Sequence, residues 1–173
     1  EADEKTLVAT TEDNWTFQGL VDLDSAGNPH VGITIGADIG EKRSAPKTLH
    51  HFRWNGKSWL SSANRDLPVG NGDIAVKSAK EVSIYLESKD KEDIGEISRW
   101  DSFDGGDTFK KGQVFLSREN SGFVISSLIE NAHPNARIIV GEKQKGTDFK
   151  KMYLLGDKGP VKRLKKEAEI LND

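Results

Sequence analysis

The chain has 173 residues, of which 35% are hydrophobic and 31% are charged, with a formal net charge of −3. This length allows one domain with a core of its own, and charge of both signs scattered along the chain argues against a nucleic-acid-binding face. The absence of cysteine excludes disulfides and thiolate metal sites. No apolar run approaches the length that spans a bilayer, so we expect neither nucleic acid nor membrane as a partner.

The N-terminal stretch 1–14 is polar apart from Thr6–Thr10, which we read as a candidate strand. Because the chain begins at Glu1 without an initiator Met, we expect a processed or excised piece. From Trp15 the pattern predicts four strands, since alternating apolar residues are separated by Gly, Pro and Asn turn signals. The expected strands are Thr16–Leu23, His30–Gly36, Thr48–Trp54 and Ser58–Ser62.

A second unit follows, with expected strands Asp73–Lys77, Glu81–Glu87, Gly95–Asp101 and Thr108–Ser117. Gly56 and Trp59 align with Gly106 and Phe109 at a spacing of about 50 residues, which lies in the range of β-propeller blades. A third unit is less regular, with expected strands Phe123–Ile129, Arg137–Glu142 and Phe149–Leu155 and a short edge strand after them.

We therefore expect an all-β fold in which residues 1–173 form one segment of a β-propeller. The approximate blades are 15–63, 72–117 and 122–164, and residues 165–173 are a tail. The alternative is a lectin-like β-sandwich. Because propellers close with at least four blades, three blades would leave two apolar faces open. This predicts either missing N-terminal blades or a homodimer.

The stretch Ser102–Phe109 reads Ser-x-Asp-x-Gly-x-Thr-Phe between two expected strands. We expect Asp104 to accept backbone N–H groups of the turn, and the adjacent glycines to take positive φ. The pattern resembles the Asp-box, or bacterial neuraminidase repeat, which closes the third-to-fourth-strand hairpin of propeller blades in sialidases and related glycan-active proteins. The resemblance implies structural roles, on the rim away from ligand, for Ser102, Asp104, Gly106, Thr108 and Phe109.

His50 and His51 lie near the long loop 37–47, on the rim where the resemblance places ligand, and they are the catalytic candidates. Imidazole can exchange a proton near neutral pH, although adjacent strand residues point to opposite faces, so only one can reach a given site. His30 and His133 are expected to be turn residues on the Asp-box rim. We expect no metal and no cofactor.

The substrate-binding candidates are three arginines, because a guanidinium can hold a carboxylate or sulfate with two hydrogen bonds. They are Arg43, Arg53 and Arg137. Tyr85 and Tyr153 fall in expected strands and provide no sialidase-like nucleophile pair. The tryptophans at the hairpins are expected to pack between blades rather than to stack on sugars.

Two further stretches, D-x-x-G-N-P-H-V from Asp24 and L-H-H-F-R-W-N-G-K-S-W from Leu49, look like Asp-box proteins related to ulvan lyases. In those proteins His, Tyr and Arg perform β-elimination beside a uronate. The resemblance implies part of a secreted or periplasmic glycoside hydrolase or polysaccharide lyase that acts on acidic polysaccharide, with an incomplete site in this chain. The alternative is a non-catalytic propeller that binds glycan or protein.

Overall fold

The computed structural model describes residues 6–11, 14–37, 47–64, 67–128, 133–144 and 151–161. Within these ranges the regular structure consists of strands, which form three four-stranded antiparallel sheets. None of the described residues belongs to a helix that could cross a membrane.

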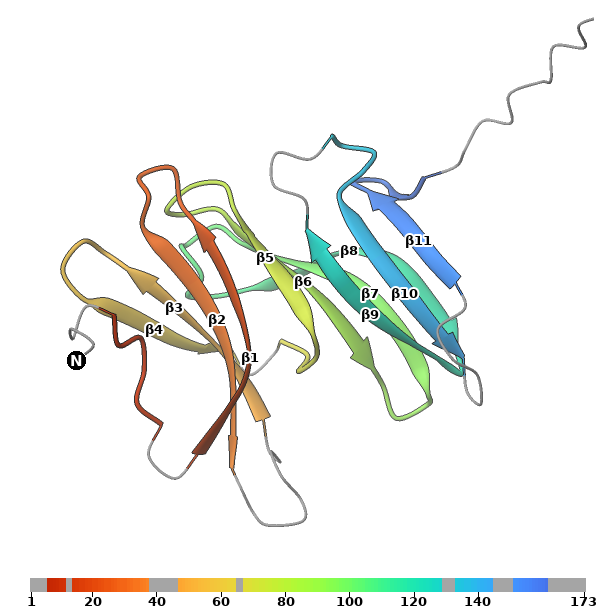
Figure 1. The fold of residues 1–173 in the computed structure, drawn as a ribbon, viewed down its shortest axis with the longest axis horizontal. Coiled ribbons are helices and arrows are strands. Elements are labelled where there is room, and N and C mark those ends of the chain that lie inside the picture. The colour runs from red at the N-terminus through yellow and green to blue at the C-terminus, as the bar shows by residue number, and fades with distance from the viewer. Residues whose placement is uncertain are drawn as a thin grey trace, which may run out of the picture.

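Each sheet is built from four consecutive strands, and we call the sheets blades 1, 2 and 3 (Figure 1). Blade 1 contains β1 (Asn14–Leu23), β2 (Pro29–Ala37), β3 (Lys47–Trp54) and β4 (Trp59–Asn64). Blade 2 contains β5 (Gly72–Val76), β6 (Val82–Lys89), β7 (Ile94–Ser102) and β8 (Lys110–Glu119). Blade 3 contains β9 (Ser121–Leu128), β10 (Ile138–Gln144), β11 (Lys151–Gly156) and β12 (Gly159–Pro160).

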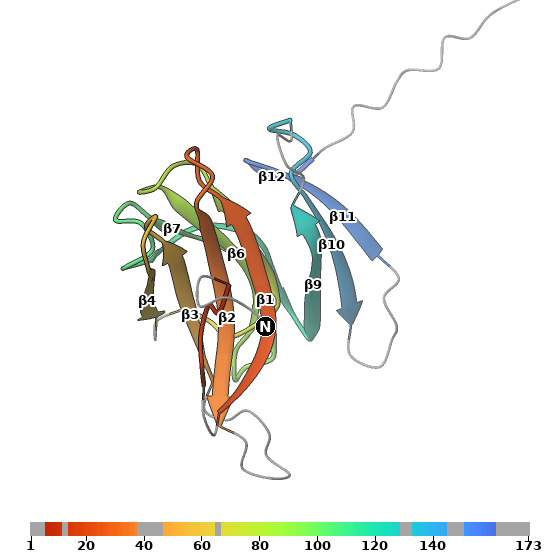
Figure 2. The same cartoon turned by 60° about the vertical axis from the view of Figure 1, so that its left-hand side comes forward.

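The first strands of the blades lie next to one another, since β1 contacts β5 and β5 contacts β9. Figure 1 and Figure 2 show the three sheets as successive layers, an arrangement that blades have in a β-propeller. Consecutive strands share one sheet, whereas the Greek-key connections of a β-sandwich pass between two sheets. The expected propeller architecture is therefore confirmed.

The strand connections divide the blades into two rims. We call the rim with the β1–β2, β3–β4 and β7–β8 connections the turn rim, and the opposite rim, with the β2–β3, β6–β7 and β10–β11 connections, the loop rim. Each strand runs from one rim to the other, so a residue's place along its strand decides the rim that it approaches.

The core lies between the blades because side chains alternate across each sheet. Ile84 and Leu86 face blade 1, whereas Tyr85 between them faces blade 3. Both faces of blade 2 are thus covered, and each fully buried aliphatic side chain contributes about 1.5–3 kcal/mol. Blades 1 and 3 each keep one face with exposed apolar residues, which are Val21, Leu23, Ile139, Met152 and Leu154.

The candidate strand Thr6–Thr10 is not a strand in the structure. Ala9, Thr10 and Thr11 instead line a cavity of about 410 Å³ over the open face of blade 1, together with side chains from β2, β3 and β4. This segment lies over a part of the open face of blade 1 and does not pair with an edge strand, so the prediction of a strand here is wrong.

Candidate functional site

The predicted turn between β7 and β8 closes through its own side chains. Ser102 Oγ donates to Asp104 Oδ1 over 2.7 Å and accepts the Gly106 N–H over 2.8 Å. Asp104 accepts the backbone N–H of Thr108 at 2.9 Å and its hydroxyl at 2.6 Å. Burial acts to raise the pKa of Asp104, but the bonds from Thr108 and Ser102 outweigh it and lower that pKa to about 2. The expected acceptor role of Asp104 is confirmed.

Blade 1 holds this turn of blade 2 from the side. Arg53 Nη1 donates to the carbonyl oxygens of Asp104, at 3.2 Å, and Gly105, and its Nη2 donates to Asp107 at 3.2 Å. Ser62 Oγ donates to the other carboxylate oxygen of Asp107 at 2.9 Å. Arg53, a substrate-binding candidate, therefore lies in the contact between two blades.

His51 lies beneath the same turn. Its Nε2 is 3.0 Å from Nδ1 of His30, and each histidine is only 1% exposed. A Cβ at Gly106 would lie 2.1 Å from the His51 ring, so the turn backbone packs directly on the imidazole. Burial, with the nearby His30 and Arg53, lowers the pKa of His51 to about 3. The two histidines form a neutral, buried pair within blade 1, and the turn of blade 2 packs on it through Gly106.

The other predicted residues lie elsewhere. His50 points to the open face of blade 1 and lines the small cavity there. Arg137 donates through Nε and Nη2 to Asp157 near the turn rim, and Arg43 lies outside the described residues. The structure therefore does not gather His50, His51, Arg53 and Arg137 into one site, and their catalytic and binding roles stay predictions.

A cavity of about 810 Å³ opens at the turn rim where the first strands of the three blades meet. Its carboxylates serve the fold: Asp22 Oδ2 accepts the Val76 N–H and Asp73 Oδ2 accepts the Leu128 N–H, each at 2.7 Å. Both bonds join neighbouring blades. With Asp24 and Glu81, its wall carries four carboxylates against the two cations Lys77 and Arg137, so this cavity is poorly suited to an acidic polymer.

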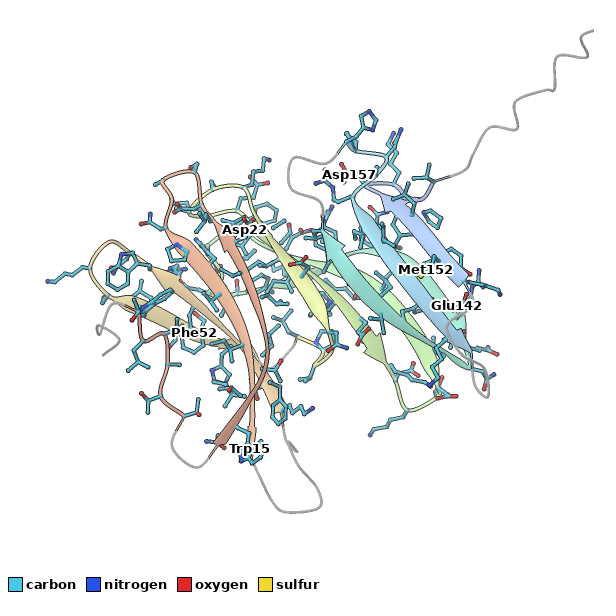
Figure 3. The ribbon with its side chains drawn as sticks, in the orientation of Figure 1. Trp15, Asp22, Phe52, Glu142, Met152 and Asp157 are labelled. Carbon is cyan, nitrogen blue, oxygen red and sulfur yellow. The ribbon has the colours of Figure 1, made fainter. Side chains whose placement is uncertain are left out.

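A different cluster lies at the loop rim, between blades 2 and 3. We call it the Glu142 cluster, and it consists of Arg118, Ser121, Glu142, Lys151 and Tyr153. The side chain of Glu142 is 0% exposed and accepts bonds from the Ser121 hydroxyl at 3.0 Å, from Tyr153, and from Arg118 at 3.2 and 3.3 Å. The Arg118 guanidinium lies over the Tyr153 ring at 5.5 Å. Figure 3 shows Glu142 on the opposite rim from Asp22 and Asp157.

The electrostatics of the cluster follow from these bonds. Burial acts to raise the pKa of Glu142, but the bonds from Tyr153 and Ser121 and the charges of Arg118 and Lys151 hold it below its ordinary value. Burial and the bond to Glu142 raise the pKa of Tyr153. At neutral pH the cluster therefore holds one carboxylate, a protonated phenol and two cations. Among the described residues, no group of three or more potential metal ligands occurs.

Three antiparallel blades around adjacent first strands define a β-propeller segment, and its partly exposed cations suit an anionic ligand. No protein-family model matches the chain. The chain is 65% identical over 172 residues to an ulvan lyase of Nonlabens ulvanivorans, which covers 99% of this chain and 36% of that protein. It is 41% identical over 165 residues to an ulvan lyase of Alteromonas sp. strain LOR, covering 94% and 34% of the two chains.

Two solved structures of an ulvan lyase of polysaccharide lyase family PL25 each match this chain with a TM-score of 0.79 at 34% identity. Each match covers 91% of this chain and 36% of the other. One of them is bound to -[GlcA(1-4)Rha3S]-. The chain is thus homologous to part of these lyases and spans about a third of the length of the relatives it matches.

Proposed function

We propose that this chain forms three blades of a polysaccharide lyase that acts on ulvan. The observation that carries the proposal is the 65% identity over 172 residues to the Nonlabens ulvan lyase, together with the same propeller fold. A lyase removes the proton beside the carboxylate of a uronate and expels the oxygen at C4, which leaves an unsaturated sugar. The reaction needs a group that neutralises the carboxylate and groups that move protons.

We place the substrate at the loop rim, beside the Glu142 cluster. Its side chains of Arg118 and Lys151 are 42% and 50% exposed and can meet carboxylate or sulfate. Tyr153, whose ring lies under the Arg118 guanidinium, is the proton-carrying group of this site. Glucuronate and sulfated rhamnose in the ligand of the solved relative have the matching charge.

We further infer that the Ser102–Phe109 turn is an Asp-box with a structural role. Its support is the set of bonds among Ser102, Asp104 and Thr108, and the packing of Gly106 on His51. This turn lies on the opposite rim from the Glu142 cluster, which agrees with a division between structural turns and ligand-facing loops.

The open faces of blades 1 and 3 suggest how this segment is completed. We infer that further blades of a longer propeller cover Val21 and Leu23 on one side and Met152 and Leu154 on the other, because the matched relatives are about three times as long. Sedimentation of the 173-residue chain as a dimer would favour a second copy instead. Because ulvan is a large polymer, we propose a secreted or periplasmic location, which fractionation of the native cells would test.

A chimera tests the lyase proposal. The matched third of the Nonlabens ulvan lyase is replaced by these residues, and cleavage of ulvan is followed by the ultraviolet absorbance of the unsaturated uronate. The expected result is retained cleavage, because the segment supplies equivalent blades. A folded chimera that binds ulvan without cleaving it would contradict the lyase assignment and favour a non-catalytic glycan-binding propeller.

A further inference from the structure

Among the described residues, Arg118 is held on the side that faces Glu142 and Tyr153. Nη1 donates to both oxygens of Glu142, and the guanidinium lies on the ring of Tyr153. A guanidinium has five N–H donors in a fixed plane, so donors remain beyond those that reach Glu142. With 42% of its side chain exposed, Arg118 can offer these donors to a ligand from solvent.

Lys151 supplies a second cation at the same place. It lies directly opposite Glu142 in the β10–β11 ladder, and its Nζ is 4.0 Å from Glu142 Oε2. Among the described residues, one buried carboxylate thus faces two cations, which leaves a surplus of one positive charge at a half-exposed position. Such a surplus attracts an anion more strongly than a balanced ion pair does.

We propose that Arg118 and Lys151 form an oxyanion subsite for a sulfate or carboxylate of the polysaccharide, with Glu142 as the positioning residue that fixes them. The subsite rests on the proposed function for the identity of its ligand. Sulfate and carboxylate share the chemistry that a guanidinium recognises, namely oxygens spaced for two parallel N–H donors. Glu142 is too buried to meet the ligand itself and acts through the groups that it holds.

The experiment measures binding of an oligosaccharide with the -[GlcA(1-4)Rha3S]- repeat to the 173-residue chain by titration calorimetry. Desulfated and carboxyl-reduced forms of the same oligosaccharide identify which oxyanion is bound. The variants are Arg118→Gln, Arg118→Lys and Lys151→Gln, and the control is Lys80→Gln, which removes an exposed lysine at the turn rim. Circular dichroism checks that each variant is folded.

Arg118→Gln is expected to weaken binding about tenfold or more, since the variant loses a charge-assisted hydrogen bond to the ligand. Arg118→Lys should recover part of the affinity, because it restores charge without the planar fork. Lys80→Gln should bind as the wild type does. Undiminished binding by Arg118→Gln and Lys151→Gln, or no binding by the wild type at millimolar concentration, would overturn the subsite.

Glu142→Gln tests the positioning role separately. The chain has two tyrosines, so a Tyr85→Phe background leaves Tyr153 as the one phenol in an ultraviolet pH titration. Removing the charge of Glu142 should lower the pH at which Tyr153 ionises and weaken oligosaccharide binding together. Unchanged ionisation and unchanged affinity would reject this role for Glu142.

Failure of the subsite is distinguishable from failure of the lyase proposal. A chimera that cleaves ulvan equally well with Arg118→Gln would remove the subsite and keep the lyase function. Oligosaccharide binding that depends on Arg118, together with a chimera that does not cleave ulvan, would keep the subsite and reject the lyase function.

Discussion

His51 Nε2 lies 3.0 Å from His30 Nδ1, and both rings are buried where blade 1 meets the β7–β8 turn of blade 2. The contact joins β2 to β3 within blade 1, and Gly106 of the blade 2 turn packs on the His51 ring. Its two rings stay neutral at physiological pH because burial lowers both pKa values. Protonation of either ring would therefore weaken the packing of blade 1 against the turn of blade 2.

This contact predicts loss of stability in mild acid. The pKa of His51 in the folded chain, about 3, lies below its unfolded value of 6.5. The contribution of neutral His51 to stability is therefore complete above pH 6.5 and is lost as pH falls toward 3. Between these two pH values the free energy of unfolding falls by up to about 1.4 kcal/mol per pH unit for one histidine. Urea unfolding at several pH values measures it. His51→Gln should flatten the profile, and an unchanged profile would refute the assignment.

Glu87 predicts the opposite pH dependence. Asn71 N–H donates to its Oε1 at 3.1 Å, whereas its Oε2 is buried without a partner among the described residues. Burial raises the pKa of Glu87 to about 7, despite the bonds from Asn71. The contribution of the protonated Glu87 carboxyl to stability is thus complete below about pH 4.5 and is lost as pH rises through 7. Glu87→Gln should stabilise the chain at pH 8 by roughly 1–2 kcal/mol, after allowance for solvent screening. Equal or lower stability of the variant at that pH would count against a buried, unpaired carboxyl.

Gly106 and Gly56 form a matched pair of turn glycines. Their φ angles are 95° and 89°, so alanine costs about 1–2 kcal/mol at either position through the backbone alone. A Cβ at Gly56 would meet nothing within 4 Å, whereas at Gly106 it would lie 2.1 Å from His51. Gly106→Ala should therefore destabilise the chain much more than Gly56→Ala in thermal unfolding. Similar losses would show that the turn does not pack on His51.

Asp104 is expected to stabilise the turn without contributing to ligand binding. Asp104→Ala removes the acceptor of the Thr108 N–H and hydroxyl bonds, and because the residue is exposed the loss should be about 1–2 kcal/mol. Chemical denaturation measures this loss, and oligosaccharide affinity of the folded variant provides the control. Full stability combined with lost binding would contradict the structural role.

The blades and the turn were predictable because their signals are local. Alternating apolar residues define each strand, and Gly105-Gly106 with Asp104 defines the hairpin within eight residues. The neighbours of His51 and Arg53 were not predictable, since the turn that they contact follows about 50 residues later and reaches them only when blades pack.

The Glu142 cluster was missed for a similar reason. Arg118 lies near the end of β8 in blade 2, Ser121 begins blade 3, and Tyr153 reaches Glu142 through the pairing of β10 with β11. Tyr153 has the alternation of an ordinary strand residue, so its sequence position indicated packing. A usable signal was the placement of polar residues at strand ends that approach one rim.

The proposed binding of ulvan at the loop rim is tested most directly by mapping the residues that respond to the oligosaccharide. Backbone amide chemical shifts of the 173-residue chain are recorded during titration with an oligosaccharide of the -[GlcA(1-4)Rha3S]- repeat. Binding at the Glu142 cluster predicts shifts at the loop rim, centred on Ser121, Lys151 and Tyr153. Shifts centred instead on Gly106, His30 and the acidic cavity of the turn rim would contradict it.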